Sequence, residues 1–349
     1  MFRIETQTAI YETNFFHAQI NITSRCNMRC EHCRGAYEGV VDLSIDDFEK
    51  LILFCNYHLA EGAGYLISGG EPLLHPQFRE ILKLLKKYLR KDGFVAVTTN
   101  GSFLDSKLLD YIETLEIPEF RISVSLDSVN PERHNLFRHC PYAFKRAVRA
   151  IKLVSESPNI KCIVRTTIQK DQLNEVEKIA CLVESLGADV LSISSVIPVG
   201  RALNKPGMYF DKCSKKRLVE LPGKIMKRHP RLKIDINDPL FYINSCSTGN
   251  GCGEYGGCIA GIGSFSVEPT GVMLSCPVLP NHVIMNICGK SPEQMMIEYS
   301  NSPIIHSLFD RSLTGKCGDC KLRFSCGGCR ARAEGIYGSY LAEDPDCWL

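Results

Sequence analysis

Three cysteines within eight residues form the first group in the sequence with clear chemical potential. Cys26, Cys30 and Cys33 are spaced C-x3-C-x2-C in the segment SRCNMRCEHC. A structural zinc site normally uses four protein ligands, and four cysteines are also usual for a closed iron–sulfur cluster. Three thiols with no fourth nearby therefore predict a four-iron cluster with one iron open to a substrate or cofactor. His32 is a possible fourth ligand for zinc, but its place beside Cys33 makes that the weaker alternative.

A second set of cysteines lies in the last third of the chain. After about residue 230 the sequence becomes dense in glycine and cysteine, and helical periodicity fades. We expect such a loop-rich segment to need bound metal to stabilise its fold, because it cannot rely on a hydrophobic core alone. The candidate ligands are Cys252, Cys258, Cys276, Cys317, Cys320, Cys326, Cys329 and Cys347. Two zinc ribbons are the alternative, since C-x2-C pairs are common zinc ligands.

The overall composition is that of a soluble globular protein. Among 349 residues, 44% are hydrophobic and 23% are charged, and a net charge of +2 gives no argument for a nucleic-acid partner. No apolar run approaches the roughly 18–20 residues of a membrane span, and no export signal is evident. We therefore expect a cytoplasmic protein, in which its 18 cysteines favour metal binding over disulfides.

The elements that must position these residues alternate along the first two thirds of the chain. Apolar runs predict strands at 18–23, 64–68, 94–100, 121–127, 162–168 and 190–196. Amphipathic patterns predict helices at 44–60, 76–91, 105–115, 142–156 and 171–187, the first capped by Ser44. Buried strands alternating with helices predict an α/β fold with a parallel sheet, here a partial (β/α)6 TIM-like barrel.

The predicted barrel brings the polar segments together. In parallel barrels chemistry gathers where the strands end, and polar segments such as TSRC, SGGEP, TTNGS and SLDS follow the predicted strands. We expect a small cysteine-rich α+β iron–sulfur domain after the barrel. The predicted organisation is an N-terminal segment at 1–16, the barrel at 17–228 and the cysteine-rich domain at 229–349.

The cysteine loop together with SGGEP (68–72) resembles the radical S-adenosylmethionine (SAM) superfamily over about 200 residues. By itself SGGEP would be an ordinary strand-ending turn. The resemblance implies that Glu71 holds the SAM amino group, that Ser125 lies near the ribose and that Arg138 pairs with the carboxylate, for which an arginine fork is suited. The cofactor contacts implied are Ser68, Gly69, Gly70, Glu71, Asn100, Ser125, Asp127, Arg138 and Val199.

The C-terminal cysteines resemble the SPASM extension of that family, which holds two auxiliary four-iron clusters. The resemblance implies one cluster on Cys252, Cys258, Cys276 and Cys329, and a second on Cys317, Cys320, Cys326 and Cys347. The sequence departs from many relatives in having C-x2-C, rather than C-x3-C, between Cys326 and Cys329. In sulfatase-maturing relatives an aspartate, the proposed base, occupies the position of Pro277, so we do not expect sulfatase maturation here. Cys140 and Cys246 remain as candidate hydrogen donors, although packed thiols are the simpler interpretation.

The resemblance implies a radical SAM enzyme with three 4Fe–4S clusters and SAM as cofactors. Such an enzyme cleaves SAM reductively to a 5′-deoxyadenosyl radical, which abstracts a hydrogen atom from the substrate. We expect peptide modification, with modification of tetrapyrrole side chains in haem or haem d1 synthesis as the alternative. A non-catalytic iron–sulfur electron carrier is the alternative of another class, and it leaves SGGEP without a role.

The expected partners follow from this chemistry. A reducing flavodoxin or ferredoxin would supply the electron. Because barrel-like sequence begins near residue 18, a peptide substrate would need a separate leader-peptide-binding protein. We expect neither a nucleic acid nor a membrane as a partner.

Overall fold

A single large sheet organises the protein in the computed structural model, which describes residues 1–35, 39–243 and 257–349. Within this described part the sheet has ten strands in the order β12-β11-β10-β3-β4-β5-β6-β7-β8-β9. Neighbouring strands from β10 to β9 pair in parallel, whereas β11 and β12 pair antiparallel at one edge. The strands are β3 (Phe15–Asn21), β4 (Leu59–Ser68), β5 (Phe94–Thr99), β6 (Glu119–Ser125), β7 (Ile160–Ile168), β8 (Val190–Ser195), β9 (Lys233–Ile236), β10 (Ser264–Val267), β11 (Val272–Leu274) and β12 (Val283–Asn286).

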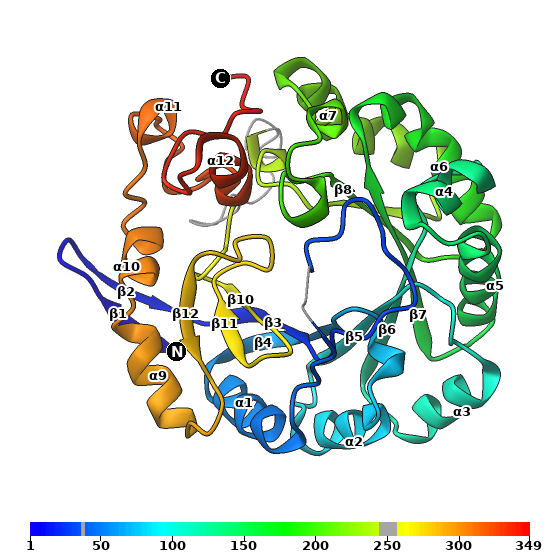
Figure 1. The fold of residues 1–349 in the computed structure, drawn as a ribbon, viewed down its shortest axis with the longest axis horizontal. Helices are drawn as coiled ribbons and strands as arrows, with labels where there is room; N and C mark the ends of the chain where they lie inside the picture. The colour runs from blue at the N-terminus through cyan, green and yellow to red at the C-terminus, as the bar shows by residue number, and fades with distance from the viewer. Residues whose placement is uncertain (36–38, 244–256) are drawn as a thin grey trace.

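Helices surround this sheet, which curves into an open arc (Figure 1). They lie along the outside of the arc. Ser44 caps the first of them, α1, as predicted, because its Oγ accepts a hydrogen bond from the Asp47 backbone N–H. The helices between barrel strands are α1 (Ile45–His58), α2 (Phe78–Tyr88), α3 (Ser106–Thr114), α4 (Pro131–Arg138), α5 (Ala143–Ser155) and α6 (Val176–Ser185), followed by α7 (Lys212–Arg228). This arrangement is the predicted α/β partial barrel.

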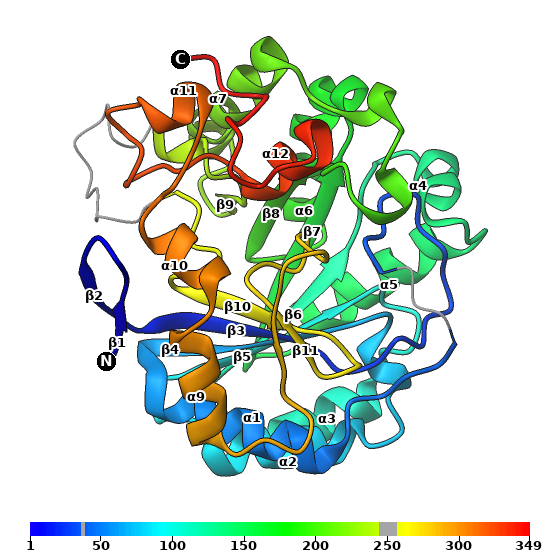
Figure 2. The same cartoon turned by 60° about the vertical axis from the view of Figure 1, so that its left-hand side comes forward.

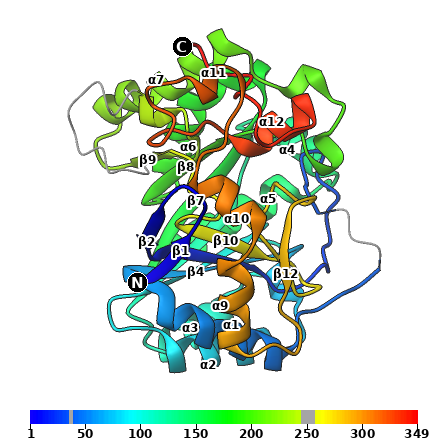
Figure 3. The same cartoon turned by 90° about the vertical axis from the view of Figure 1, so that its left-hand side faces the viewer.

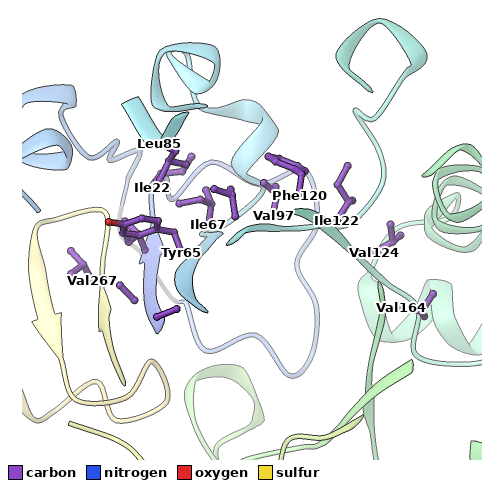
Figure 4. Close-up of a cluster of buried hydrophobic side chains, with 14 of the residues drawn as sticks. Ile22, Tyr65, Ile67, Leu85, Val97, Phe120, Ile122, Val124, Val164 and Val267 are labelled. Carbon is purple, nitrogen blue, oxygen red and sulfur yellow. The ribbon is translucent and has the colours of Figure 1, made fainter. Parts of the chain in front are cut away.

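The hydrophobic core fills the layer between sheet and helices. Figure 4 shows side chains of successive strands, among them Ile67, Val97, Ile122, Val124 and Val164, meeting in this layer. Because side chains alternate along a strand, the residues between them face the interior of the arc. Those intervening residues are mostly polar, so the sheet separates an apolar outer face from a polar interior.

The C-terminal segment lies beside the barrel and also extends its sheet. Figures 2 and 3 show this segment running from α9, beside α1, past α10 to α11 and α12 near α7. Its helices are α9 (Pro292–Ser300), α10 (Pro303–Phe309), α11 (Gly315–Gly318) and α12 (Arg330–Tyr337). A Cβ at Gly335 would lie 2.3 Å from the Pro198 carbonyl oxygen, so α12 packs tightly on the loop that follows β8.

The structure adds elements that the sequence patterns did not predict. The six predicted strands and five predicted helices are present, with ends shifted by a few residues. However, β9 and β10–β12 continue the sheet into 229–349, and a hairpin of β1 (Phe2–Glu5) and β2 (Ile10–Thr13) precedes it. The β-like runs SFSVEP and VMLSC in the sequence correspond to β10 and β11, but strands of three or four residues carry too little alternation for their place in the sheet to be recognised. The division at residues 228/229 remains a prediction. No helix of the described residues is both long and apolar enough to cross a membrane.

Candidate active site

The cysteine loop follows β3, and its backbone is hydrogen-bonded to the loop that follows β8. Arg201 donates from Nε to the Cys30 carbonyl oxygen (2.8 Å) and from its backbone N–H to the Cys33 carbonyl oxygen (3.0 Å). Gly200, at φ +55°, has no room for a side chain because a Cβ would lie 2.6 Å from the Cys33 carbonyl oxygen. The loop that follows β8 therefore fixes the backbone that carries Cys30 and Cys33.

The three thiols of this loop lie close enough to interact electrostatically. Cys26 is the most exposed of them and Cys30 is buried. Burial raises the pKa of the Cys30 thiol, while the nearby Arg138 guanidinium lowers it. Crowding by protein atoms likewise raises the pKa of Cys26 to about 11, although its side chain remains open to solvent. The thiols therefore lose protons when they bind a metal cluster at neutral pH.

The SGGEP segment runs directly against the cysteine loop. The Gly70 N–H donates to the Thr23 carbonyl oxygen and the Glu71 N–H to the Arg25 carbonyl oxygen, each at 2.7 Å. A Cβ at Gly69, where φ is +146°, would lie 2.5 Å from the Thr23 oxygen, and one at Gly70 would lie 2.3 Å from the Arg25 oxygen. Both glycines are thus needed for contact between the two loops, before any ligand is considered.

Glu71 is buried among hydrogen-bond donors at the ends of β4 and β5. Its carboxylate accepts from Thr99 Oγ1 (2.7 Å), from the Asn100 N–H (2.7 Å) and from the Leu73 N–H (3.3 Å). Burial raises the pKa of Glu71 to about 7, although these donors oppose the rise. Asn100 also donates from Nδ2 to Asn27 Oδ1 (2.9 Å), which joins the β5 end to the cysteine loop. A buried carboxylate of this kind is suited to an ammonium group.

Arg138 and Asp127 form a buried ion pair beside Cys30. The Arg138 Nε donates to Asp127 Oδ2 at 2.6 Å, and the Thr167 N–H donates to Asp127 Oδ1 at 2.9 Å. Burial alone would raise the pKa of Asp127, but Arg138 and two histidines lower it to about 2. Arg138 is thus a buried residue of the site. Its other guanidinium nitrogens make no hydrogen bond to any residue that the structure describes.

The remaining predicted cofactor residues lie at the same edge of the sheet. Ser68 ends β4, and its carbonyl oxygen accepts from the Ile22 N–H (2.9 Å). Ser125 ends β6, and Val199 lies in the turn that leads to Gly200 and the cysteine loop. The structure therefore brings the predicted cofactor residues to one end of the barrel.

The C-terminal thiols form two groups. Cys258, Cys276 and Cys329 interact electrostatically with one another, and burial raises the pKa of Cys276 to about 12. The predicted fourth member, Cys252, lies outside the described residues. A separate pocket is lined by Cys317, Cys320, Cys326 and Cys347.

These groups consist of thiols, which are ligands of both zinc ions and iron–sulfur clusters. Among the described residues, no three His, Cys, Asp or Glu side chains are arranged to hold one metal ion.

Two buried carboxylates, Asp238 and Asp344, were not predicted from the sequence and lie beside the C-terminal thiol groups. Asp344 Oδ2 accepts from the Cys329 N–H (2.6 Å), while the Asp344 N–H donates to the Cys317 Sγ (3.4 Å). Arg332 on α12 binds Asp344 (2.7 Å) and Asp238 (2.6 Å), and all three side chains are buried. Asp344 therefore touches both C-terminal thiol groups. No motif marked these residues, and Arg332 lies 94 residues from Asp238 in the sequence.

A second missed contact joins the cysteine loop to the C-terminal segment. Arg34, next to Cys33, donates from Nη1 to Glu268 Oε1 (2.7 Å) and to the Pro277 carbonyl oxygen (3.0 Å). Pro277 follows Cys276 directly, so one arginine spans the first cysteine loop and the turn that carries Cys276.

The leftover candidates have simpler surroundings. Cys140 is buried against Cys30, Met28 and Ala143, so it packs on the cysteine loop. Cys246 lies outside the described residues. The His32 ring stacks on Phe137 at 4.5 Å, and burial lowers the pKa of His32 to about 3.

Comparison with known proteins agrees with this geometry. The family model described as the radical SAM superfamily matches residues 20–183. The chain is 30% identical over 343 residues to an AdoMet-dependent heme synthase of Methanosarcina barkeri, covering 93% of this chain and 94% of that protein. It is 29% identical over 323 residues to the subtilosin biosynthesis protein AlbA of Bacillus subtilis, covering 90% and 66%. The crystal structure of Streptococcus suis SuiB bound to precursor peptide SuiA matches with a TM-score of 0.78 at 17% identity, covering 97% of this chain and 76% of SuiB.

Proposed function

We propose that this protein abstracts a hydrogen atom from a peptide in order to modify it. The proposal starts from the family: the chain belongs to the radical SAM superfamily and is an enzyme that binds SAM and a 4Fe–4S cluster. When bound, SAM and the reduced cluster supply a 5′-deoxyadenosyl radical as the abstracting species. The observation that carries the proposal is the convergence of the three-cysteine loop, buried Glu71 and Arg138 at one barrel end.

In this proposal Cys26, Cys30 and Cys33 hold the SAM-binding cluster. The buried Glu71 carboxylate receives the ammonium of SAM, and the guanidinium nitrogens of Arg138 that do not contact Asp127 bind the SAM carboxylate. Asp127 orients Arg138 through the 2.6 Å contact, so it acts on SAM through that arginine.

Two auxiliary 4Fe–4S clusters complete the proposed cofactor set. One uses Cys252, Cys258, Cys276 and Cys329, and the other uses Cys317, Cys320, Cys326 and Cys347. The grouping of the described thiols supports this division. A reducing flavodoxin or ferredoxin would supply the electron.

Peptide modification is the first candidate because AlbA, named for subtilosin biosynthesis, is 29% identical over 90% of this chain. Modification of tetrapyrrole side chains is the second candidate. It is favoured by the match to the M. barkeri heme synthase, which covers 94% of that protein against 66% of AlbA. Because of this difference in coverage, the comparisons favour the tetrapyrrole candidate more strongly than the sequence patterns do. A separate leader-peptide-binding protein belongs only to the peptide candidate.

The first experiment measures 5′-deoxyadenosine by mass spectrometry after anaerobic reconstitution with iron and sulfide, using SAM and dithionite. We expect formation above a no-protein control. The triple variant Cys26→Ala, Cys30→Ala, Cys33→Ala should form none while retaining the auxiliary iron. Cleavage by the triple variant would contradict the assignment of these ligands. No cleavage by fully loaded wild type, with either substrate class added, would favour an electron carrier.

The second experiment separates the substrate classes. Candidate peptides and coproporphyrin III are each added, and the increase in 5′-deoxyadenosine over the substrate-free rate is measured. Stimulation by coproporphyrin III alone would displace the peptide proposal in favour of the second candidate.

A further inference from the structure

One arginine in the barrel interior has no carboxylate partner. Arg165 lies on β7, one residue after Val164, whose side chain joins the apolar layer between sheet and helices (Figure 4). Because side chains alternate along a strand, Arg165 faces the opposite way, into the barrel interior. It makes no side-chain hydrogen bond or ion pair with any residue in 1–35, 39–243 and 257–349.

The strand register places a hydroxyl on each side of this arginine. Arg165 lies directly beside Ser125 on β6 and directly beside Ser192 on β8. Neighbours at the same level of a sheet share a face and lie roughly 5 Å apart. Both serines are 9% exposed, and neither hydroxyl has a hydrogen-bond partner within the described ranges. The interior thus presents an arginine fork flanked by two unused hydroxyls.

The carboxylates nearest to Arg165 do not neutralise it. Asp127 is committed to Arg138 at 2.6 Å. Asp235 is exposed on β9, next to Ser192 in the same row, and so stands two strands, or roughly 10 Å, from Arg165.

The other charged neighbours add no negative charge. Burial lowers the pKa of Arg165, and the nearby Arg34 and Arg138 lower it further, while the charges of Asp235 and Asp127 oppose this shift from a distance. His17 across the interior is uncharged at neutral pH, because burial and then Arg165 lower its pKa to about 4. An arginine remains protonated under these conditions, so the interior carries a positive charge that no carboxylate of the described residues contacts directly. A partly buried charge of this kind is costly unless a ligand pairs with it.

We propose that Arg165, with Ser192, binds a carboxylate group of the substrate. The planar guanidinium matches a carboxylate with two parallel hydrogen bonds, and the Ser192 hydroxyl can donate to the same oxygens. Ser125, on the other side of Arg165, keeps the place near the SAM ribose that the family resemblance implies. This inference rests on the proposed function and narrows the substrate to a carboxylate-bearing molecule. The carboxylate can come from an acidic peptide residue or from a tetrapyrrole side chain. Since Ser125 ends β6 beside the SAM-binding residues, the bound carboxylate would anchor the substrate next to SAM.

The test measures binding without turnover, so it does not depend on radical chemistry. Reconstituted protein with SAM is titrated with two probe pairs. One pair is coproporphyrin III and its tetramethyl ester, and the other is a short peptide containing glutamate and its glutamine counterpart. The variants are Arg165→Gln and the conservative Arg165→Lys. Arg121→Gln is the matched control because Arg121 shares the β6 face with Ser125, yet it already pairs with Glu119 at 2.9 Å.

We expect wild type to bind one carboxylate probe at least about tenfold more tightly than its neutral counterpart, the size of one charge-assisted contact. Arg165→Gln should abolish this preference, Arg165→Lys should retain part of it, and Arg121→Gln should leave it unchanged. The probe pair that responds identifies the source of the carboxylate. SAM affinity should not change in any variant.

Three results would overturn the proposal: no carboxylate preference in wild type for either pair, a preference that survives Arg165→Gln, or loss of SAM binding in that variant. The last result would assign Arg165 to SAM itself. Failure of the proposed function is recognised separately, as absence of 5′-deoxyadenosine from loaded wild type.

Discussion

Replacing Lys215 by methionine tests how much a buried ion network stabilises the junction of barrel and C-terminal segment. Lys215 on α7 has no exposed surface, and its Nζ donates to Ser195 Oγ (2.6 Å) and Asp238 Oδ2 (2.9 Å). Arg332, from α12, donates to the same carboxylate at 2.6 and 3.1 Å. Two cations from distant parts of the chain therefore share Asp238. Methionine keeps most of the lysine stem and removes only the charge.

The expected loss follows from these distances. At 2.9 Å and an effective dielectric constant of about 20, the Lys215–Asp238 attraction is about 6 kcal/mol. Desolvation of the buried ammonium offsets several kcal/mol of this, and removing one partner of a buried pair usually costs about 3–5 kcal/mol. Because Arg332 still neutralises Asp238, we expect the lower end, a loss of about 3 kcal/mol in the free energy of unfolding.

The loss should depend on pH in one direction. Burial alone would raise the pKa of Asp238, but Arg332 and Lys215 hold it well below its usual value of 3.8. A carboxyl group with a lowered folded-state pKa stabilises the fold above its unfolded pKa, and that contribution is lost as the pH falls through the folded value. Lys215 also lies 3.3 Å from Asp346, whose pKa burial raises against the opposing effect of Arg332 and Lys215. The difference between wild type and Lys215→Met should therefore shrink as the pH falls, first as Asp346 takes up a proton and further below about pH 4 as Asp238 does.

Anaerobic urea unfolding of the reconstituted protein provides the assay, followed by circular dichroism and by Trp348, the single tryptophan, which packs on the apolar cluster around Leu240. Lys216→Met is the matched control, because Lys216 is the next residue of α7 and is exposed. The control should stay within about 0.5 kcal/mol of wild type. A Lys215→Met loss below about 1 kcal/mol would refute this account of the network.

Three further substitutions test the loops. Gly70→Ala should abolish SAM binding, because its Cβ would lie 2.3 Å from the Arg25 carbonyl oxygen and push the two loops apart; calorimetric titration with SAM checks this, and unchanged affinity would contradict it. Arg201→Met should weaken iron retention in the first cluster, because the Cys30 carbonyl loses its 2.8 Å donor; an unchanged reduced-cluster EPR signal after dialysis against a chelator would argue against such a role. Cys347→Ala should lower the iron content and the thermal stability of the C-terminal segment, since this thiol lines the second pocket; wild-type iron content would mean that the ligand set is misassigned.

The sequence by itself determined the fold class and the chemical family, because both depend on local patterns. Strand and helix periodicities are readable within short windows, and all the predicted barrel elements are present. The C-x3-C-x2-C loop and SGGEP are likewise contiguous segments. Their meeting at one sheet edge followed from the rule that parallel strands present their ends together. The structure then showed that the glycines of SGGEP are needed for contact with the cysteine loop itself.

Only the tertiary structure decided which distant residues become partners. Arg34 bridges to Glu268, and Asp344 touches both Cys329 and Cys317, yet no local spacing indicates either contact. The row that places Arg165 between Ser125 and Ser192 depends on strand register across three separate strands. Register and ion pairing are settled by how whole layers pack, because a shift of one residue would turn each side chain to the other face of the sheet.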